Sequence, residues 1–477
     1  MNWDVVITGE HWQQLRQHLF PGDHQEHGAI LRCGYVETTT HRRLLVREVI
    51  PANEVTDYLP GRRSNRTLTA DFIAGNALQF AEDGSAYLAV HCHGGDDRVA
   101  FSETDLRSHE HGYPGLLQLI GGPAVGALVF AVNSVAGDLW TPDGQRHTLD
   151  KLIITDPQRT ELTATPRPDQ PIAEQYNRQG LMFGRRGQQI LANQKIAIIG
   201  LGGAGSLINQ MTARLGVGHV LLIDSDRVDE SNLSRVVGAT RFDAHTWLTR
   251  TGNPGWVRRL GERLSSTKVR VAARVARRAS PSVTVETVSG NVEDPGVAER
   301  LRDCDHIFLA ADSHTARHVV NAIAHQYLVP VTQLGAKVTV GSVTGELTSV
   351  FSVSRLIVPG QGCLWCNGLI SRSQLTDEGK SEADRVRQRY VDGEDVHAPS
   401  VITLNSIAAS FAVNEWLLRT VGVAHRVGAP EWVHVDSLNG EVLADVTRKD
   451  PDCRWCGPAR FGVGDAKPLP VKRAATK

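Results

Sequence analysis

The N-terminal part of the chain mixes short apolar runs with two amphipathic stretches. Apolar runs of strand length alternate with segments whose apolar residues recur at helical spacing. The runs cover residues 29–35, 44–50, 87–91 and 125–132, and the helical segments cover residues 11–20 and 71–83. This mixture predicts an α/β domain over residues 1–153.

A proline-rich stretch separates this domain from the rest of the chain. Residues 155–171 contain few apolar side chains and show no periodicity, so we expect a linker over residues 154–173. Beyond it, strand, glycine loop, helix and strand follow one another, which is typical of a Rossmann-like parallel sheet. This second α/β domain is expected over residues 174–460, followed by a disordered tail over residues 461–477.

The composition is that of a soluble globular protein. Hydrophobic residues make up 41% and charged residues 22% of 477 residues, a length that favours two or three domains. The formal net charge of −1 gives no electrostatic reason to bind nucleic acid or an anionic membrane. The most apolar long stretch, residues 116–132, is broken by glycines and Pro123, and the first residues lack the features of a signal peptide. We therefore expect a cytoplasmic protein.

A glycine-rich turn follows an apolar strand in the second domain. Residues 195–206 read KIAIIGLGGAGS, in which the glycines let backbone N–H groups approach a phosphate at the start of a helix. After the next strand, Asp224 is placed to hydrogen-bond a ribose. These features predict a nucleotide site, but they suit a dehydrogenase equally well. The glycines concerned are Gly200, Gly202, Gly203 and Gly205.

Four polar residues downstream favour ATP over a dinucleotide. Asn232 and Arg235 lie just past the second strand, and Lys268 follows them. Basic groups at the mouth of an ATP site neutralise phosphate charge as pyrophosphate leaves. Asp312, at the end of the strand HIFLAAD, can hold magnesium. Each of these residues alone would more often be a solvated surface group, but hydride transfer would not call for the set.

Four of the seven cysteines form two CxxC pairs, Cys363 with Cys366 and Cys453 with Cys456. Four thiolates within reach of one ion make a closed, structural zinc site. The alternatives are two redox dithiols, or cysteines in no special relation to each other. The turn residues beside both pairs and a reducing compartment favour zinc.

A histidine pair ends one of the N-terminal strands. His91 and His93 point to the same side of the strand, and Asp105 follows on the first turn of a helix. Two imidazoles and one carboxylate leave an open position on zinc, which can then activate water for hydrolysis. Glu26 is a candidate general base, and Ser102 is a candidate to steady the oxyanion.

Each part of this pattern has an ordinary alternative. With 19 histidines a chance pair is common, and His109 and His111 form a second pair with no carboxylate at the same spacing. Ser102 and Asp105 also fit an ordinary helix capping box. Cys92, between the two histidines, should face the other side of the strand as a buried structural thiol.

From the YNRQG motif at residue 176 onward, the chain resembles the ThiF/MoeB family, which includes the ubiquitin-activating enzymes. The motifs GLGGAGS and DSDRVDESNLSR follow in the family's order, and the likeness covers roughly residues 174–460. It implies a glycine turn around the nucleotide, a ribose contact, contacts to the phosphates and a magnesium ligand. Carried over by motif, these are Gly200, Gly202, Gly203 and Gly205, then Asp224, then Asn232, Arg235 and Lys268, and finally Asp312.

The same resemblance implies a homodimer, because Arg178 matches an arginine that family members extend into the neighbouring subunit's ATP site. It also supports zinc at the four CxxC cysteines. The chain departs from the family at Ala311, Ser313 and Val236, where threonine, asparagine and glutamine are frequent. The reaction implied is ATP-dependent adenylation of a carboxylate, in which the enzyme positions the reactants and neutralises charge.

The chain lacks a cysteine where related enzymes form a thioester with their cargo. That cysteine usually lies in the segment after the first CxxC pair, and residues 367–399 contain none. We therefore expect the adenylate to pass directly to another protein, such as a conjugating enzyme, or to a small nucleophile. The other route is an ester on a hydroxyl of Ser371, Ser373 or Thr376.

Residues 1–150 resemble the JAB/JAMM metalloprotease family. The likeness rests on the order Glu26, then the His-x-His motif at residues 91–93, then the Ser-x-x-Asp motif at residues 102–105. Members of that family cleave after the C-terminal glycine of ubiquitin or ubiquitin-like proteins. Both domains are therefore expected to act on the same kind of tail, one of the Gly-Gly type.

We expect a bifunctional enzyme of a bacterial ubiquitin-like conjugation pathway, which adenylates the carrier's tail and also processes or releases it. The first alternative is a sulfur-carrier adenylyltransferase that prepares a thiocarboxylate for cofactor biosynthesis. A second alternative is a non-catalytic scaffold that only binds partners. The basic run at residues 268–278 is predicted to be a solvated helix face rather than a nucleic-acid site, because no aromatic platform accompanies it.

Overall fold

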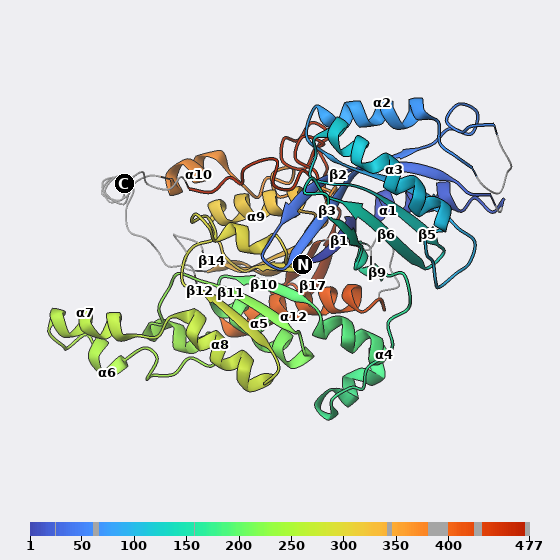
Figure 1. Ribbon diagram of the computed structural model, residues 1–477. Coiled ribbons are helices and arrows are strands. Elements are labelled where there is room, and N and C mark those ends of the chain that lie inside the picture. Colours follow the sequence, from blue (N-terminus) through green and yellow to red (C-terminus); the bar gives the residue numbers. More distant parts are fainter. Residues whose placement is uncertain are drawn as a thin grey trace. The chain divides into compact units, whose positions relative to one another are not determined.

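The computed structural model divides the chain into two compact units (Figure 1). The first unit comprises Met1–Asp169, His325–Leu328 and Cys456–Pro468. The second unit comprises Gln170–Ala324, Val329–Trp455 and Leu469–Lys477. The structure describes all residues except 24, 61–65, 157, 341–345, 380–398, 424–431 and 473–477.

In the described part of the first unit, nine strands form one mixed sheet. The strands are β1 (Asn2–Ile7), β2 (Gly28–Glu37), β3 (His41–Pro51), β4 (Ala86–Cys92), β5 (Val125–Ala131), β6 (Ser134–Trp140), β7 (Arg146–Thr148), β8 (Lys151–Ile154) and β9 (Thr160–Leu162). Their order in the sheet is β7-β6-β5-β4-β2-β3-β1-β8-β9. β4 therefore lies inside the sheet, antiparallel to β2 and parallel to β5.

Helices cover both faces of this sheet. They are α1 (Gly9–Leu19), α2 (Ala70–Ala81) and α3 (Glu103–Ile120). Leu15 of α1 packs into a core with Leu31 of β2. Phe80 of α2 and Tyr113 of α3 pack into a separate core with Ile30. Ile30 and Leu31 enter different cores because successive side chains of a strand point to opposite faces of the sheet.

The predicted strands and helices of this unit are confirmed to within a few residues, but its borders differ from the prediction. Thr160–Leu162, which lies inside the predicted linker, forms strand β9 and pairs with β8. Leu162 is buried in the core of the unit, which stabilises this strand. The predicted disordered tail is ordered over residues 461–468, where Gly462 N donates to His325 O at 2.9 Å and Val463 is buried. Residues 473–477 of that tail lie outside the described residues.

In the described part of the second unit, eight strands form the other sheet. The strands are β10 (Lys195–Ile199), β11 (His219–Ile223), β12 (Thr284–Val288), β13 (His306–Leu309), β14 (Val331–Val340), β15 (Leu347–Ile357), β16 (Trp432–Asp436) and β17 (Glu441–Asp445). Their order is β12-β11-β10-β13-β14-β15-β16-β17. The neighbours from β12 to β14 are parallel, and those from β14 to β17 are antiparallel.

Helices pack around this second sheet (Figure 1). The α-helices are α4 (Asn177–Ala192), α5 (Gly203–Leu215), α6 (Thr246–Thr249), α7 (Gly255–Leu264), α8 (Lys268–Ala279), α9 (His314–Gln326), α10 (Arg372–Glu378) and α12 (Ile402–Thr420). Short 3-10 helices are η1 (Glu174–Tyr176), η2 (Glu230–Ser234) and η3 (Ala298–Leu301). Ile196 and Ile198 of β10 are fully buried, in a core that also contains Ile208 of α5 and Trp416 of α12. Among the described residues, no helix has both the length and the apolar character that crossing a membrane requires.

The strand order creates a place for a ligand. β10 comes first along the chain and lies between β11 and β13, so the chain leaves β10 toward one side and later returns on the other. In open parallel sheets, ligands bind beyond the carboxyl ends of the strands at such a switch point. Gly200 follows β10, Asp224 follows β11 and Asp312 follows β13, so all three belong to loops at this edge of the sheet.

Candidate functional site

Three potential metal ligands come together at the end of β4. The Nε2 atoms of His91 and His93 lie 3.1 Å apart. Asp105 Oδ2 lies 3.7 Å from the first of these nitrogens and 3.6 Å from the second. All three side chains are partly exposed. Atoms this close can bind one ion, and two imidazoles with one carboxylate form a ligand set that zinc accepts while keeping a position open.

Regular local structure explains this convergence. His91 and His93 are two positions apart at the end of a strand, and Asp105 lies on the first turn of α3. Ser102 caps that helix, with its N and Oγ donating to Asp105 Oδ2 at 2.8 and 2.7 Å. The capping box and the candidate metal ligand therefore share one carboxylate, and the oxyanion role of Ser102 stays a prediction. Burial acts to raise the pKa of Asp105, but hydrogen bonds with His91 and Ser102 outweigh it and hold that pKa below its usual range.

Cys92 faces away from this cluster, as its position in the strand predicts. Its thiol is buried, donates to Leu19 O at 3.1 Å, and accepts from His27 N at 3.3 Å. Burial raises the pKa of this thiol, so it is not a reactive thiolate. Glu26 is half-buried beside His27 and precedes β2, the neighbour of β4.

The second histidine pair has a different environment. His109 Nδ1 lies 2.7 Å from Asp138 Oδ2 in the core, and the ring of His109 stacks on Tyr113. Arg146 donates to the same carboxylate. Burial acts to raise the pKa of Asp138, but the hydrogen bonds with His109 and Arg146 outweigh it and lower the pKa. His111 is exposed on α3, so this pair serves packing rather than a shared ligand.

The glycine turn after β10 needs glycine for steric reasons. Gly200 has φ +85°, and a Cβ there would lie 2.9 Å from Ala311 N. A Cβ on Gly205, in the first turn of α5, would collide with Gly200 O, and one on Gly203 would collide with Asn405. At Gly202, the N-cap of α5, the space around a Cβ is open. The loop is thus tightly packed on the protein side and open at the helix N-terminus, where a phosphate can bind.

Asp224 is tied to this turn. Its Oδ2 accepts from Leu201 N at 2.6 Å and its Oδ1 accepts from Asp226 N at 2.8 Å. Burial raises the pKa of this carboxyl, in spite of the opposing charge of Lys268. Each carboxylate oxygen has a second lone pair, so Asp224 can still accept a ribose hydroxyl while it holds the loop.

The three residues expected at the phosphates are all engaged within the protein. Lys268 Nζ, on the first turn of α8, donates to Asp226 Oδ2 at 2.8 Å. Arg235 donates to Ser231 O at 2.8 Å. Asn232 is buried with its Nδ2 donating to Asp229, and its Oδ1 has no partner among the described residues. That free atom is an acceptor, which suits a hydroxyl or a cation better than a phosphate oxygen.

Asp312 and Arg178, both predicted to act at the nucleotide site, differ in their relation to the glycine turn. The loop that carries Asp312 touches the turn, because Ala311 lies against Gly200. Asp312 itself is exposed, as a metal ligand at the mouth of a site can be. Arg178, in the first turn of α4, is also exposed and contacts none of these groups in the hydrogen bonds and ion pairs of the described residues. Its role therefore stays a prediction.

The sequence analysis missed two arginines in this unit. Arg317 on α9 is five residues beyond Asp312, and Arg355 lies on β15 among apolar residues. Burial lowers the pKa of Arg317, and burial together with the charge of Arg317 lowers that of Arg355 to about 10. An arginine inside the apolar run FSVSRLIV is the sequence signal that points to such a group, because arginine is rarely buried without a partner.

The four CxxC cysteines lie close together. Their sulfur atoms all lie within 4.8 Å of one another. Cys363 Sγ is 3.5 Å from Cys366 Sγ and 3.7 Å from Cys453 Sγ, well beyond a disulfide bond. Cys456 is buried, and it completes the set. Four thiolates in this arrangement fit one tetrahedral zinc ion with no open position.

The segment after the first CxxC pair is described only in part. Ser371 caps α10, and its Oγ lies 2.7 Å from Ser373 Oγ. Thr376 donates to Arg372 O at 2.9 Å. Residues 380–398 lie outside the described residues. The hydroxyls proposed as ester sites are therefore on one short helix, and that role stays a prediction.

Comparison with known proteins places residues 176–455 in a family model named ThiF, which is more than half of the chain. The SAMP-activating enzyme E1 of Haloferax volcanii is 28% identical over 160 residues, which cover 33% of this chain and 52% of that protein. The molybdopterin-synthase adenylyltransferase of Escherichia coli is 29% identical over 171 residues, covering 35% and 61%. The matched region thus spans about half to three-fifths of these relatives.

Among solved structures, the microcin C7 biosynthetic enzyme MccB of Escherichia coli in complex with N-formylated MccA is similar, with 19% identity and a TM-score of 0.46. The match covers 60% of this chain and 75% of the MccB chain. The family model spans the glycine turn, the loops after β11 and β13, and three of the four clustered cysteines. The chain belongs to the ThiF family.

Proposed function

We propose that the ThiF region uses ATP to adenylate the C-terminal carboxylate of a ubiquitin-like protein with a Gly-Gly-type end. The observation that carries this proposal is the glycine turn at the switch point, with Asp224 hydrogen-bonded to Leu201 N at 2.6 Å and Lys268 linked to the same loop through Asp226. Relatives of this region are named for activating SAMP and for adenylyl transfer to molybdopterin synthase. This set of groups suits a nucleoside triphosphate and a carboxylate that attacks it.

The reaction follows from the charges around the turn. An oxygen of the cargo carboxylate attacks the α-phosphorus, the bond from that phosphorus to the bridging oxygen breaks, and pyrophosphate leaves. Lys268 and Arg235 neutralise the charge that moves onto pyrophosphate. Backbone N–H groups of the glycine turn hold the phosphates, and Asp224 accepts a ribose hydroxyl. Magnesium, held by Asp312, would add charge neutralisation when bound.

Carrier-dependent exchange of labelled pyrophosphate into ATP tests this function. We expect exchange by the intact chain with the carrier and Mg²⁺, and Asp312→Ala should abolish it. Exchange without a carrier would point to a small-molecule substrate, and no exchange would refute the proposal. We further propose a homodimer in which Arg178 reaches the second subunit's site. Mixing Arg178→Ala and Asp312→Ala subunits should then restore part of the exchange.

The fate of the adenylate distinguishes two pathways. We favour transfer to another protein, directly or through a conjugating enzyme, because the three cysteines outside the four-cysteine cluster, Cys33, Cys92 and Cys304, are buried. The runner-up is a sulfur carrier, which relatives of this region also activate. After incubation with ATP and cell extract, a higher-mass conjugate supports the first pathway, and a carrier that gains only sulfur supports the second.

We also propose that the first unit is a zinc-dependent peptidase of the JAB/JAMM kind, which cleaves after the same tail. The convergence of His91, His93 and Asp105 within 3.7 Å supports it. Zinc held there would polarise water and lower its pKa toward neutrality when bound. In this proposal, Glu26 takes a proton from the attacking water and returns it to the leaving amine.

Cleavage of a carrier with a C-terminal extension tests this activity. We expect the intact chain to remove the extension, and removal of zinc or Glu26→Gln to stop it. Cleavage that survives Glu26→Gln in metal-free protein would contradict the assignment. An isopeptide-linked conjugate as a second substrate shows whether the site matures the carrier or removes it from targets.

A further inference from the structure

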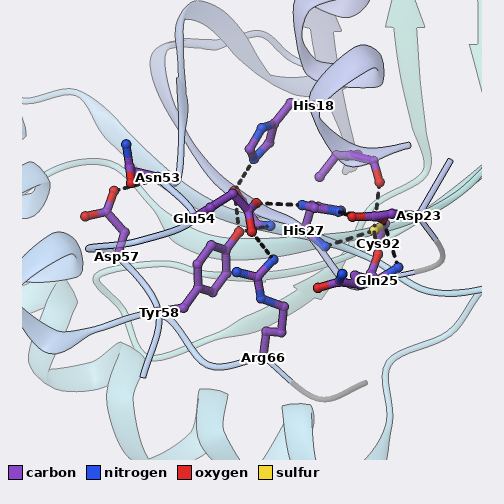
Figure 2. Close-up of polar contacts among 12 residues, drawn as sticks. His18, Asp23, Gln25, His27, Asn53, Glu54, Asp57, Tyr58, Arg66 and Cys92 are labelled. Atoms are coloured by element: carbon purple, nitrogen blue, oxygen red, sulfur yellow. Dashed lines mark hydrogen bonds and ion pairs between the residues drawn. The ribbon is translucent and has the colours of Figure 1, made fainter. Parts of the chain in front are cut away.

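A chain of polar side chains surrounds His27, the residue that follows Glu26 in the sequence (Figure 2). His27 is at its centre, with Nε2 2.9 Å from Asp23 Oδ1 and Nδ1 3.0 Å from Glu54 Oε1. The imidazole is therefore held at both nitrogens, between a residue before Glu26 and a residue after β3. The side chain of His27 is only 5% exposed, whereas those of Asp23 and Glu54 are 40% and 53% exposed.

The two carboxylates restrain the imidazole of His27. Each ring nitrogen lies within hydrogen-bond distance of a different carboxylate, so the ring cannot rotate or shift without losing one of the two contacts. The direction of the Asp23 pKa agrees, because the hydrogen bond with His27 lowers it.

The far side of this network is anchored as well. Glu54 also pairs with Arg66 at 2.7 Å, and the guanidinium of Arg66 lies 3.6 Å from the centre of the Tyr58 ring. Tyr58 OH in turn accepts from Gly28 N at 2.8 Å. The segment after β3 therefore holds the chain at His27 by its side chain and at Gly28 by its backbone, the two residues that follow Glu26 (Figure 2).

The same two residues join Glu26 to the strand of the metal ligands. His27 N donates to Cys92 Sγ at 3.3 Å, and Cys92 N donates to His27 O at 3.2 Å. Gly28 pairs with His91 across β2 and β4. Glu26 is thus one residue away from two independent sets of contacts, while its own carboxylate has no hydrogen bond or ion pair among the described residues.

We propose that His27 is a positioning residue: held between Asp23 and Glu54, it fixes the backbone that presents Glu26 to the metal site. This inference rests on the proposed peptidase function. A general base works only within hydrogen-bond reach of its proton, and a displacement of about 1 Å can cost about 100-fold in rate. The ordering of residues 25–28 therefore affects the chemical step and not the affinity for the carrier.

Steady-state cleavage of an extended carrier by His27→Gln tests this role. Glutamine can bond only one carboxylate and carries no charge, so we expect kcat to fall by about 10- to 100-fold with KM changed by less than about threefold. Zinc content should stay at the wild-type level, because the ligands come from β4 and α3. An unchanged kcat, or a loss of activity that merely follows loss of zinc, would overturn the proposal.

A milder pair of variants applies if His27→Gln does not fold. Glu54→Gln weakens one of the two contacts at a half-exposed position and should lower kcat several-fold. Glu48→Gln is its matched control, since Glu48 is 49% exposed and also pairs with an arginine, Arg32, but does not contact His27. Equal kcat in the two variants would overturn the proposal.

A measurement independent of activity separates the inference from the function. In proton–nitrogen-15 spectra of the intact zinc-bound protein, the backbone N–H of residue 27, which donates to Cys92 Sγ, should exchange with deuterium faster in His27→Gln than in the wild type. Equal exchange rates in the two proteins would refute the positioning mechanism even in an active peptidase. No cleavage by the wild-type protein would refute the peptidase and the inference with it, whatever the spectrum shows.

Discussion

The two candidate sites differ in how their polar groups are held. At the end of β4, the expected metal ligands already face one another, with His91 and His93 nitrogens 3.1 Å apart. Around the glycine turn, the expected phosphate ligands are instead bonded to the protein, as Lys268 is to Asp226 at 2.8 Å. The first set needs little movement to bind its ion, whereas the second set must exchange partners.

Charge explains this difference. Two imidazoles and a carboxylate are not a set of like charges, so the geometry of the strand and of the first turn of α3 can assemble them. Cations that will bind a polyphosphate repel one another, and each is more stable beside a local acceptor until the polyanion arrives. On the proposed function, Asp226 holds Lys268 until a phosphate replaces it. Metal binding should consequently be insensitive to changes at the turn, and nucleotide binding insensitive to changes at the metal site.

Removal of a metal ligand should give the largest effect and should be confined to one activity. His91→Gln leaves two ligands, and we expect cleavage of an extended carrier to fall by at least about 1000-fold, or about 4 kcal/mol. Pyrophosphate exchange with mature carrier should stay within about twofold of wild type. Zinc content and both rates, measured on one preparation, check this. A parallel loss of exchange would show that the sites are not independent.

Removal of the cation at the turn should produce the converse pattern. Lys268→Ala takes away a charge that stabilises departing pyrophosphate, so we expect exchange to fall by about 100-fold with cleavage unchanged. Lys195→Ala is the matched control, because Lys195 forms a similar ion pair with Asp303 at 2.7 Å but at the amino end of β10. Equal exchange rates in the two variants would remove Lys268 from the site.

The cysteine cluster should affect stability rather than either reaction step. A closed zinc site contributes directly to folding, so Cys453→Ser should lower the free energy of unfolding by about 3 kcal/mol or more. Cys304→Ser, a change at a buried thiol outside the cluster, should cost about 1 kcal/mol. Urea unfolding with and without a chelator distinguishes the two. Chelator-insensitive unfolding of the wild type would rule out a structural metal.

A carboxylate paired with an arginine of α8 should give the smallest effect, and one that depends on pH. Asp243 binds Arg274 at 2.7 Å, and although burial acts to raise its pKa, this hydrogen bond lowers it from 3.8 to about 2. A depressed pKa contributes stability that is present above about pH 4 and is lost as the pH falls toward 2. Asp243→Asn should therefore destabilise by about 1–2 kcal/mol at pH 7.

Urea midpoints of wild type and Asp243→Asn at pH 7, 5 and 3 measure this difference. It should be constant from pH 7 to 5 and smaller at pH 3, where Asp243 is mostly protonated in the unfolded chain but still largely ionised in the folded one. A difference that grows on acidification would contradict the assigned direction. Arg274→Gln should give a similar profile, because both variants break the same pair.

The sequence was informative wherever a short motif meets a regular element. The two histidines face the same side because side chains of a strand alternate with a period of two. The glycine motif marks positions, such as Gly200 and Gly205, at which a Cβ would collide with neighbouring backbone. Contacts between distant segments were not predictable. Asp226 and Arg355 depend on which loops meet, and the ordered residues 461–468 depend on hydrogen bonds with residues 325–328 that no local pattern announces.

The capping box at Ser102 and Asp105 shows why motif and ordinary structure cannot always be told apart. The geometry is compatible with both interpretations, because the same carboxylate caps α3 and faces the two imidazoles. The network around His27 was invisible for a related reason. Asp23, His27 and Glu54 are not spaced as in a known motif. Their link to the metal ligands becomes visible only when β2 pairs with β4, which places Gly28 opposite His91.

The central claim, that two sites in one chain act on the same carrier end, is tested by pyrophosphate exchange with two forms of one carrier. We predict that mature carrier supports exchange in both wild type and His91→Gln. Carrier with a C-terminal extension should support it only in wild type, after the extension is cleaved. Exchange with extended carrier in His91→Gln, or none with mature carrier in wild type, would contradict the account.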